Sequence, residues 1–214
     1  MNIILTGATG FAGGEVLSAL LADPAVHQVT ALVRRGLGVA HPKLKEVIVN
    51  DFLDYSALTS SLQADACIWC LGVSQTEVSK EDYIKITFDY ALAAARAMLA
   101  INPQLRFCFV SGRSSDQDEK SLTLQGNIKG RTEKHLSALS PNVFIFRPAF
   151  IKPARPGTAR PWIPKLFEPV AWVVDHFTDG FSVDTGALAR CLIGVAKNGG
   201  GQRIYDNAAI RQYR

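Results

Sequence analysis

Three glycines near the start of the chain restrict the fold more than any other feature of the sequence. In "ILTGATGFAGG", Gly7, Gly10 and Gly13 follow the apolar run 2–6 and open the helical pattern 11–22. In such a turn the first glycine allows a sharp bend, the second lets a pyrophosphate approach the backbone, and the third lets the helix pack closely on the strand. This context predicts a strand–turn–helix unit that binds a dinucleotide, with a tight turn that binds nothing as the alternative. The residues expected to line the phosphates are Gly7, Ala8, Thr9, Gly10, Phe11, Ala12 and Gly13.

Strand-like and helix-like segments alternate along the chain. Most strand-like runs carry apolar residues on both faces, which is typical of strands in a parallel sheet that is covered on both sides. The longest helical pattern covers 80–101, with Ser79 as its predicted N-cap, and Asp184 is the predicted cap of a later helix. We therefore expect an α/β fold with a doubly wound parallel sheet in a single domain, 1–214. The predicted strands are 2–6, 29–34, 46–50, 66–71, 106–111, 142–146 and 202–207.

The end of the second predicted strand distinguishes between the two nicotinamide dinucleotides. Where NAD-binding proteins usually carry an acidic residue for the ribose 2′-hydroxyl, the chain has "LVRRG". Arg34 and Arg35 can donate charge-assisted hydrogen bonds to a 2′-phosphate, so we expect NADP(H) to be preferred over NAD(H). Two solvated arginines are the alternative.

The ends of the third and fourth predicted strands should complete this site, because ligands bind at the carboxyl ends of the strands. Asp51 can accept a hydrogen bond from an adenine amino group, and Phe52 lies beside it in the sequence. Leu71, Gly72 and Val73 can let the ribose and the diphosphate lie on the backbone.

The composition excludes several classes of protein. The chain is 48% hydrophobic, which is enough for a packed core and excludes disorder. A net charge of +4 is too small to imply a nucleic-acid partner. The apolar runs are far shorter than the ~18 residues of a membrane helix, and a strand-like run from Asn2 leaves no room for a signal peptide. We therefore expect no transmembrane segment and a cytoplasmic location.

A basic stretch covers residues 134–167. Between Glu133 and Glu168 the chain has no acidic residue. This absence predicts either a pocket mouth that attracts an anionic small-molecule substrate or a solvated basic loop. The basic residues of the stretch are Lys134, Arg147, Lys152, Arg155, Arg160 and Lys165, of which the last three are expected at the mouth.

The four cysteines do not predict a redox or metal site. Cys67 and Cys70 form a C-x-x-C, but they lie in a predicted strand, where residues i and i+3 point to opposite faces. A zinc site would need a second pair of ligands, and the histidines show no such spacing. We expect buried structural thiols and no metal.

Several motifs together resemble the short-chain dehydrogenase/reductase superfamily, in its atypical and extended members. They are "TGATGFAGG", "CLGVSQ", "FVSGRSS", "IKGRTEKHL" and "FRPAF", and the resemblance is closest to the Tat-interacting-protein-like oxidoreductase branch. It implies a Rossmann sheet of about seven strands, bound NADP(H) with Pro148 beside it, and a substrate pocket built from the C-terminal segments. The segment 151–183 would then be an insertion on the substrate side.

The resemblance also implies a catalytic serine, tyrosine and lysine, and one of the three is replaced. Ser111 matches the serine, and Lys129 matches the lysine, which would also hold the nicotinamide ribose. Gln125 occupies the tyrosine position, and an amide cannot complete a proton transfer. Since a general acid contributes typically ~10²–10⁴-fold, its loss would slow a reaction strongly. Other candidates for the missing acid are Tyr83, Tyr90, Ser114 and Ser115, and Arg113 could polarise a carbonyl near the substrate mouth.

Three functions remain open from the sequence. The first is an NADP(H)-dependent oxidoreductase with an unusual acid. The second is a non-catalytic protein that senses NADP(H) or binds a partner when NADP(H) is bound. The third is a protein associated with a membrane surface or a complex through the region 162–172, which carries two tryptophans. A homodimer through the long helices is the assembly that we expect.

Overall fold

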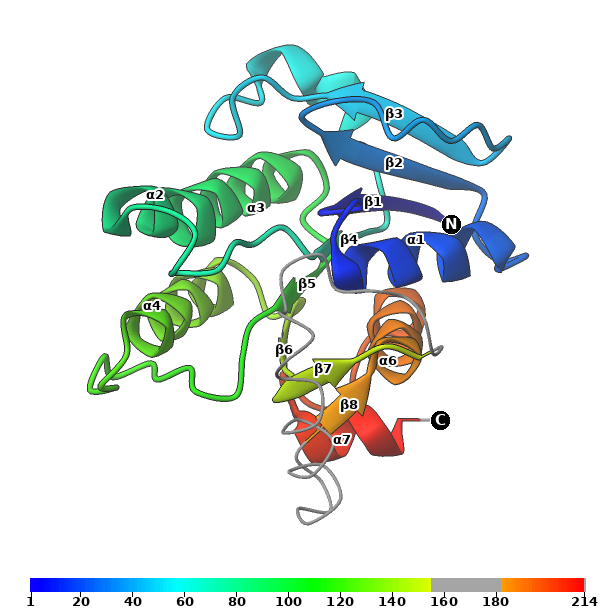
Figure 1. Cartoon of the computed structure of the whole chain (residues 1–214). Coiled ribbons are helices and arrows are strands. Elements are labelled where there is room, and N and C mark those ends of the chain that lie inside the picture. The colour runs from blue at the N-terminus through cyan, green and yellow to red at the C-terminus, as the bar shows by residue number, and fades with distance from the viewer. Residues whose placement is uncertain (155–181, 214) are drawn as a thin grey trace.

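Seven strands lie side by side in one parallel sheet, as the alternation of segments predicts (Figure 1). The computed structural model describes residues 1–154 and 182–213. The order of the strands is β3-β2-β1-β4-β5-β6-β9, and every neighbouring pair is parallel. The chain therefore moves outward in one direction from β1 to β3 and then in the other from β4 to β9. The switch between the two directions lies between β1 and β4, where ligands bind in folds of this kind.

The elements follow the sequence pattern closely. The strands of the large sheet are β1 (Asn2–Thr6), β2 (Gln28–Val33), β3 (Leu44–Ile48), β4 (Ala66–Trp69), β5 (Arg106–Val110), β6 (Val143–Arg147) and β9 (Ile204–Asp206). The helices are α1 (Phe11–Ala22), a 3₁₀ helix (Ser56–Ser61), α2 (Lys80–Ile84), a π-helical turn (Lys85–Asp89), α3 (Tyr90–Ile101), α4 (Leu124–Leu139), α6 (Thr185–Asn198) and α7 (Asn207–Gln212).

Helices cover both faces of the sheet (Figure 1). Helices α1 and α6 pack on one face, in a core that includes Ile3 and Leu5 of β1. Helices α3 and α4 pack on the other face, in a core that includes Ile4 of the same strand. Alternate residues of one strand thus enter opposite cores, as the pleat of a strand requires. The free Cys67 and Cys70 likewise contact opposite cores, which separates the two thiols of the C-x-x-C.

The predicted caps form. The hydroxyl of Ser79 accepts a hydrogen bond from the N–H of Asp82 at the start of α2. The carboxylate of Asp184 accepts one from Ala187 at the start of α6, which ends at Gly199 with a φ of 75°. These side chains satisfy backbone donors that the first helical turn leaves unpaired.

Four details differ from the sequence prediction. The third strand begins at Leu44, because its parallel pairing with β2 starts at Val29 and Leu44. The helical pattern 80–101 is interrupted by the π-helical turn, an insertion that the pattern of apolar residues does not reveal. The start of the predicted loop forms β7 (Phe150–Lys152), which pairs in parallel with β8 (Ser182–Asp184). The last strand is followed by α7, which Asp206 caps through the N–H of Ala209.

In the part of the chain that the structure describes, each helix falls short of the length and apolar character that a membrane crossing requires.

Candidate functional site

The turn after β1 has the close backbone packing that its glycines allow. Gly7 has a φ of 69°, in the left-handed region that favours glycine. The N–H of Gly10 donates to the carbonyl of Gly7 at 2.8 Å, which closes the turn before α1. A Cβ at Gly7 would lie 2.6 Å from the carbonyl carbon of Cys70, just after β4. The turn therefore lies against the neighbouring strand end, at the switch between β1 and β4.

Gly13 brings the first turn of α1 onto the backbone of Gly7. A Cβ at position 13 would lie 2.1 Å from the Gly7 carbonyl oxygen, closer than non-bonded atoms can approach. A Cβ at Gly14 would lie 3.5 Å from its nearest neighbour, the carbonyl oxygen of Ala8, which is an ordinary contact. No side chain caps α1 at Gly10, and its first turn has no acidic residue. Backbone N–H groups and the positive end of the helix thus form a cradle that fits a diphosphate.

Arg34 and Arg35 are exposed directly beyond β2. Neither guanidinium has an ion-pair partner among residues 1–154 and 182–213. The structure adds an acidic neighbour that the sequence pattern missed, since Oε2 of Glu46 on β3 accepts a hydrogen bond of 2.9 Å from the N–H of Leu37. Glu46 lies on β3, and the parallel pairing of β3 with β2 brings it near the turn after β2. The sequence alone does not show this pairing.

The segments after β3 and β4 contribute backbone groups and one carboxylate to the candidate site. Asp51 is exposed, and its Oδ1 accepts a hydrogen bond from the N–H of Leu53. Phe52 is 3% exposed and stacks on Tyr90, so its ring belongs to the core. The N–H of Leu71 donates to the hydroxyl of Thr6, which ties the end of β4 to the end of β1. Beyond it, Gly72 and Val73 are exposed and half-buried, and no atom lies within 4 Å of the position of a Cβ at Gly72.

The hydroxyl of Ser111 is engaged inside the protein. Ser111 directly follows β5 and is 3% exposed. Its Oγ donates to Oε1 of Glu133 at 2.6 Å and lies 2.8 Å from the hydroxyl of Ser115. Because the Ser111 proton points to the carboxylate, the hydroxyl of Ser115 donates to Ser111. Neither hydroxyl is left to donate to a substrate in this arrangement.

Glu133 is the centre of a buried network that the sequence analysis did not identify. Its side chain has no exposed surface, and it forms an ion pair with Arg147 at the end of β6. Nε of Arg147 lies 3.0 and 3.2 Å from the two carboxylate oxygens, and Nε2 of Gln117 donates to Oε2 at 3.0 Å. A buried carboxylate is tolerated only when it is paired and hydrogen-bonded in this way. Arg147 therefore does not belong with the basic residues of a substrate mouth, although it lies in the acid-free stretch.

Lys129 and Gln125 lie one helical turn apart on α4, with their side chains on either side of one point. A Cβ at Gly112 would lie 3.6 Å both from Nε2 of Gln125 and from Nζ of Lys129. Nζ of Lys129 donates a hydrogen bond of 2.8 Å to the carbonyl of Ser111. Burial lowers the pKa of Lys129 to about 8, and the Glu133 carboxylate opposes this shift. Two polar groups, one of them with a pKa of about 8, therefore lie close to the backbone of Gly112.

Two glycines of α4 let the preceding loop lie directly on the helix. A Cβ at Gly126 would lie 2.2 Å from the hydroxyl of Ser121, and a Cβ at Gly130 would overlap the carbonyl of Asp116. The N–H of Asp116 donates to the carbonyl of Gly126 at 3.0 Å. Thr123 caps the helix by accepting a hydrogen bond from the same Gly126. The loop and the start of α4 thus hold each other in position around Gln125.

The other candidates for the missing acid are placed less favourably. Tyr83 is 1% exposed, and burial raises the pKa of its phenol. Tyr90 stacks on Phe52 with ring centroids 5.5 Å apart. Ser115 is buried against Ser111, and Ser114 is exposed. These positions favour packing roles for the two tyrosines.

Of the expected substrate mouth, the described residues contain only Arg113. It is exposed, and its N–H donates to the carbonyl of Pro148, which brings the loops after β5 and β6 together. Arg155, Arg160 and Lys165 lie outside the described residues, as does the region 162–172 with its two tryptophans.

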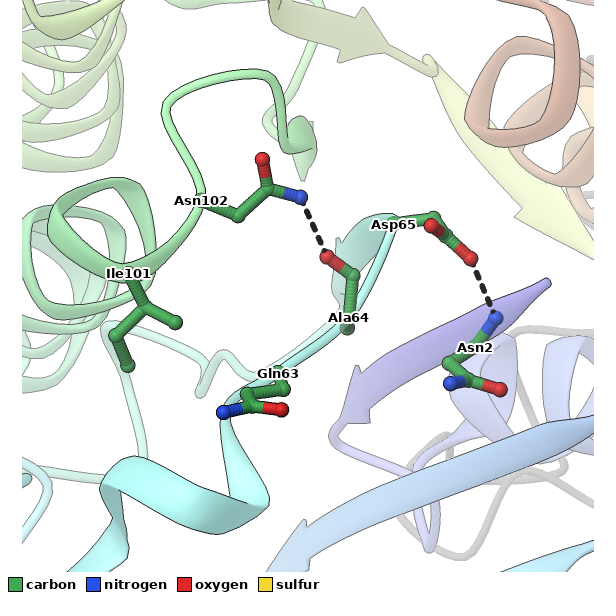
Figure 2. Close-up of a pocket in the computed structure, with 6 residues that line it drawn as sticks. All are labelled: Asn2, Gln63, Ala64, Asp65, Ile101 and Asn102. Carbon is green, nitrogen blue, oxygen red and sulfur yellow. Dashed lines mark hydrogen bonds between the residues drawn. The ribbon is translucent and has the colours of Figure 1, made fainter.

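A hollow of about 310 Å³ lies at the opposite edge of the sheet, near the amino ends of β1 and β4 (Figure 2). Two hydrogen bonds join residues of its lining. The N–H of Asn2 donates to Asp65, and the side-chain amide of Asn102 donates to the carbonyl of Ala64. The hollow lies at the other end of the strands from the glycine turn and from Lys129, so it is not part of the candidate site. Within residues 1–154 and 182–213, no three His, Cys, Asp or Glu residues are grouped to hold a metal ion.

Comparisons with known proteins agree with this geometry. The family model described as NAD dependent epimerase/dehydratase family matches residues 3–127, more than half of the 214 residues. Protein HTATIP2 from Rattus norvegicus is 24% identical over 220 residues, which cover 98% of this chain and 87% of that protein. The protein named fmp52, mitochondrial, from Emericella nidulans is 28% identical over 205 residues, which cover 90% of this chain and 85% of its own length.

Solved structures share the fold. The Bordetella bronchiseptica enzyme WbmF, solved in complex with NAD⁺, superposes with a TM-score of 0.71 and is 16% identical, covering 96% of this chain and 72% of that enzyme. At that identity the likeness shows the fold and not the substrate.

Proposed function

Because the chain belongs to the NAD-dependent epimerase/dehydratase family, within the short-chain dehydrogenase/reductase superfamily, we propose that it is an oxidoreductase that uses NADP(H) with an altered proton-transfer group. When bound, the dinucleotide would supply or accept a hydride at its nicotinamide ring. The protein would bind it, orient it and handle the proton.

The glycine cradle and the strand ends divide the binding between them. Gly7, Gly10 and Gly13 would hold the diphosphate on backbone N–H groups. Lys129 would donate to the nicotinamide ribose. Asp51, Phe52, Leu71, Gly72, Val73 and Pro148 would line the remaining length of the dinucleotide.

The observation that carries the choice of NADP(H) is the exposed pair Arg34 and Arg35 beyond β2, with no ion-pair partner among residues 1–154 and 182–213. A 2′-phosphate is the anion that a dinucleotide would present at this strand end. The carboxylate of Glu46 beside this turn already accepts the hydrogen bond of Leu37. Titration of the protein with NADPH and with NADH, followed by dinucleotide fluorescence, tests the choice directly.

A second candidate function rests on a specific observation at the site. Gln125 stands where the superfamily places its tyrosine, and the Ser111 hydroxyl is bound to Glu133. A protein that only binds NADP(H), and reports its presence to a partner, would need neither hydroxyl. Turnover of a carbonyl compound distinguishes this sensor from an enzyme.

The remaining proposals concern the substrate, the assembly and the cellular location. An anionic substrate, a homodimer through the long helices and a cytoplasmic location stay predictions of the sequence. Sedimentation tests the dimer. Cell fractionation tests the location, and recovery in mitochondria would contradict it.

A further inference from the structure

We propose that the ammonium group of Lys129, with the amide of Gln125 beside it, is the proton donor to the carbonyl oxygen of an aldehyde or ketone substrate. In this role Lys129 would replace the tyrosine that Gln125 has displaced. The inference rests on the proposed oxidoreductase function, and names the acid that this function needs.

The first argument is the placement of the other proton-bearing groups. Gln125 can donate a hydrogen bond, but its amide does not release a proton at usable pH. Ser111 donates to Glu133, and Ser115 lies buried behind it. Tyr83 is almost fully covered. In the described ranges, Lys129 is the ionisable side chain that borders the same point as Gln125.

The second argument is geometry. One N–H of the Lys129 ammonium is used on the carbonyl of Ser111, which holds Nζ beside the backbone of Ser111 and Gly112. An ammonium has three N–H groups, so two remain for ligands. Nζ and the Gln125 Nε2 are each 3.6 Å from the position that a Cβ would take at Gly112, so a carbonyl oxygen that reached this pair would meet two donors. Two donors facing one oxygen would polarise a carbonyl and stabilise the negative charge that develops on it.

The third argument is acidity. An efficient general acid has a pKa near the operating pH, and burial brings the pKa of Lys129 to about 8. Glu133 on the same helix keeps the group protonated at neutral pH, and Arg147 from β6 pairs with that carboxylate from the far side. Lys129 is therefore charged when the substrate binds and acidic enough to lose its proton.

The step balances without a further reactant. A hydride leaving the reduced nicotinamide ring would bond to the carbonyl carbon as the C=O π bond opens, and the oxygen would take one proton from Nζ. The products are an alcohol, an oxidised dinucleotide and a neutral Lys129 amine, which takes a new proton from water. In the reverse direction the neutral amine would accept the alcohol proton.

The first experiment needs no turnover. Protein containing ¹³C-labelled lysine is saturated with NADPH, and the Cε signal of Lys129 is assigned by its loss in Lys129→Arg. We expect this signal to titrate near pH 8 in the complex. A Lys129 signal that does not titrate between pH 7 and 9 would overturn the proposal.

The second experiment measures oxidation of NADPH in the presence of 9,10-phenanthrenequinone. Wild-type turnover should be slow and should fall above pH 8. Lys129→Arg should still bind NADPH, because a guanidinium can also donate to the ribose. It should lose at least ~10²-fold in rate, because a guanidinium keeps its proton. Lys134→Met should match the wild type.

The outcomes separate the two claims. If the wild type turns over and Lys129→Arg keeps its rate and pH profile, the assignment of Lys129 is wrong and the oxidoreductase function stands. If neither the wild type nor Gln125→Tyr oxidises NADPH although both bind it, the oxidoreductase function is wrong, and the proposal for Lys129 is overturned with it.

Discussion

The hydroxyl of Ser111 donates a 2.6 Å hydrogen bond to Glu133, a carboxylate with no exposed surface. This contact joins the end of β5 to the middle of α4. It turns the serine that the superfamily resemblance marks as catalytic toward the interior. The main-chain carbonyl of the same serine accepts the hydrogen bond of Lys129. The buried network therefore sets the position of the lysine without supplying a proton itself.

Replacing Glu133 should lower the pKa of Lys129. In Glu133→Gln the attraction that stabilises the ammonium is lost, so the pKa of Lys129 should fall below about 8. The lysine Cε titration measures the shift. Because Arg147 is left without its partner, a destabilisation of ~3–5 kcal/mol is also expected. The double variant Glu133→Gln, Arg147→Gln should recover part of that stability and still show the lowered pKa, and a titration identical to wild type in both variants would contradict the role of Glu133.

The same pKa predicts a change of stability with pH. Lys129 has a pKa of about 8 when folded, and an unfolded lysine has one of ~10.4. Between these values the unfolded chain binds more protons, so this residue makes the free energy of unfolding rise as pH rises from 8 towards 10. Lys129→Met should remove that contribution. Chemical denaturation of both proteins at pH 7, 8.5 and 10 measures the difference in the free energy of unfolding, and the wild type should gain stability relative to Lys129→Met as the pH rises. A difference between the two proteins that is the same at all three pH values would contradict the lowered pKa.

The arginines beyond β2 should set the choice of dinucleotide. We expect NADPH to bind at least ~10-fold more tightly than NADH, which is ~1.4 kcal/mol. The variant Arg34→Asp, Arg35→Ala should lose this preference, because a carboxylate would repel the 2′-phosphate and could accept from a 2′-hydroxyl. Arg96→Ala, an exposed arginine on α3, is the matched control and should keep the preference. Equal wild-type affinities for the two dinucleotides would refute this prediction.

Two adjacent glycines offer a stringent test of the phosphate cradle. Gly13→Ala places a methyl group 2.1 Å from the carbonyl oxygen of Gly7, so the turn or the helix must move. We expect loss of dinucleotide binding and a destabilisation of ~1–3 kcal/mol. Gly14→Ala meets an ordinary contact at 3.5 Å and should be neutral or stabilising by ~0.5–1 kcal/mol, since alanine favours a helix. Isothermal titration and thermal unfolding of the two variants, side by side, check both halves.

Gln125→Tyr should restore an ordinary acid. The new phenol would lie one turn before Lys129 on the same face of α4. Turnover of the quinone should rise by up to ~10²–10⁴-fold, and its pH dependence should shift away from that of the wild type. Unchanged turnover in a variant that still binds NADPH would favour the sensor over the enzyme.

The sequence predicted most strands of the large sheet because they are largely apolar runs that alternate with helical patterns. It predicted the glycine turn because Gly7, Gly10 and Gly13 are tied to backbone geometry that few other residues permit. It missed β7 and α7, since three residues are too few for a period to be visible and α7 begins directly at the end of a strand.

The network around Glu133 could not be predicted in the same way. Ser111, Glu133 and Arg147 are far apart in the chain, and only the pairing of β5 with β6 and the packing of α4 bring them together. One signal was present, because Glu133 follows Lys129 at i+4 and so lies on the same face of the helix. The other signal was Arg147, a charged residue at the end of the apolar strand β6. Neither signal predicts the ion pair of Glu133 with Arg147, because the sequence does not show that α4 packs next to the end of β6.

The glycines of α4 have a consequence for hydrogen exchange. The loop that precedes this helix has no regular secondary structure, and such segments ordinarily exchange their amide protons fast. Here the N–H of Asp116 is bonded to the Gly126 carbonyl, with the loop backbone pressed against Gly130. Deuterium should therefore enter this amide at the slow rate of α4 itself. Enlarging Gly130 should release the loop and speed its exchange while the strands behind it remain protected.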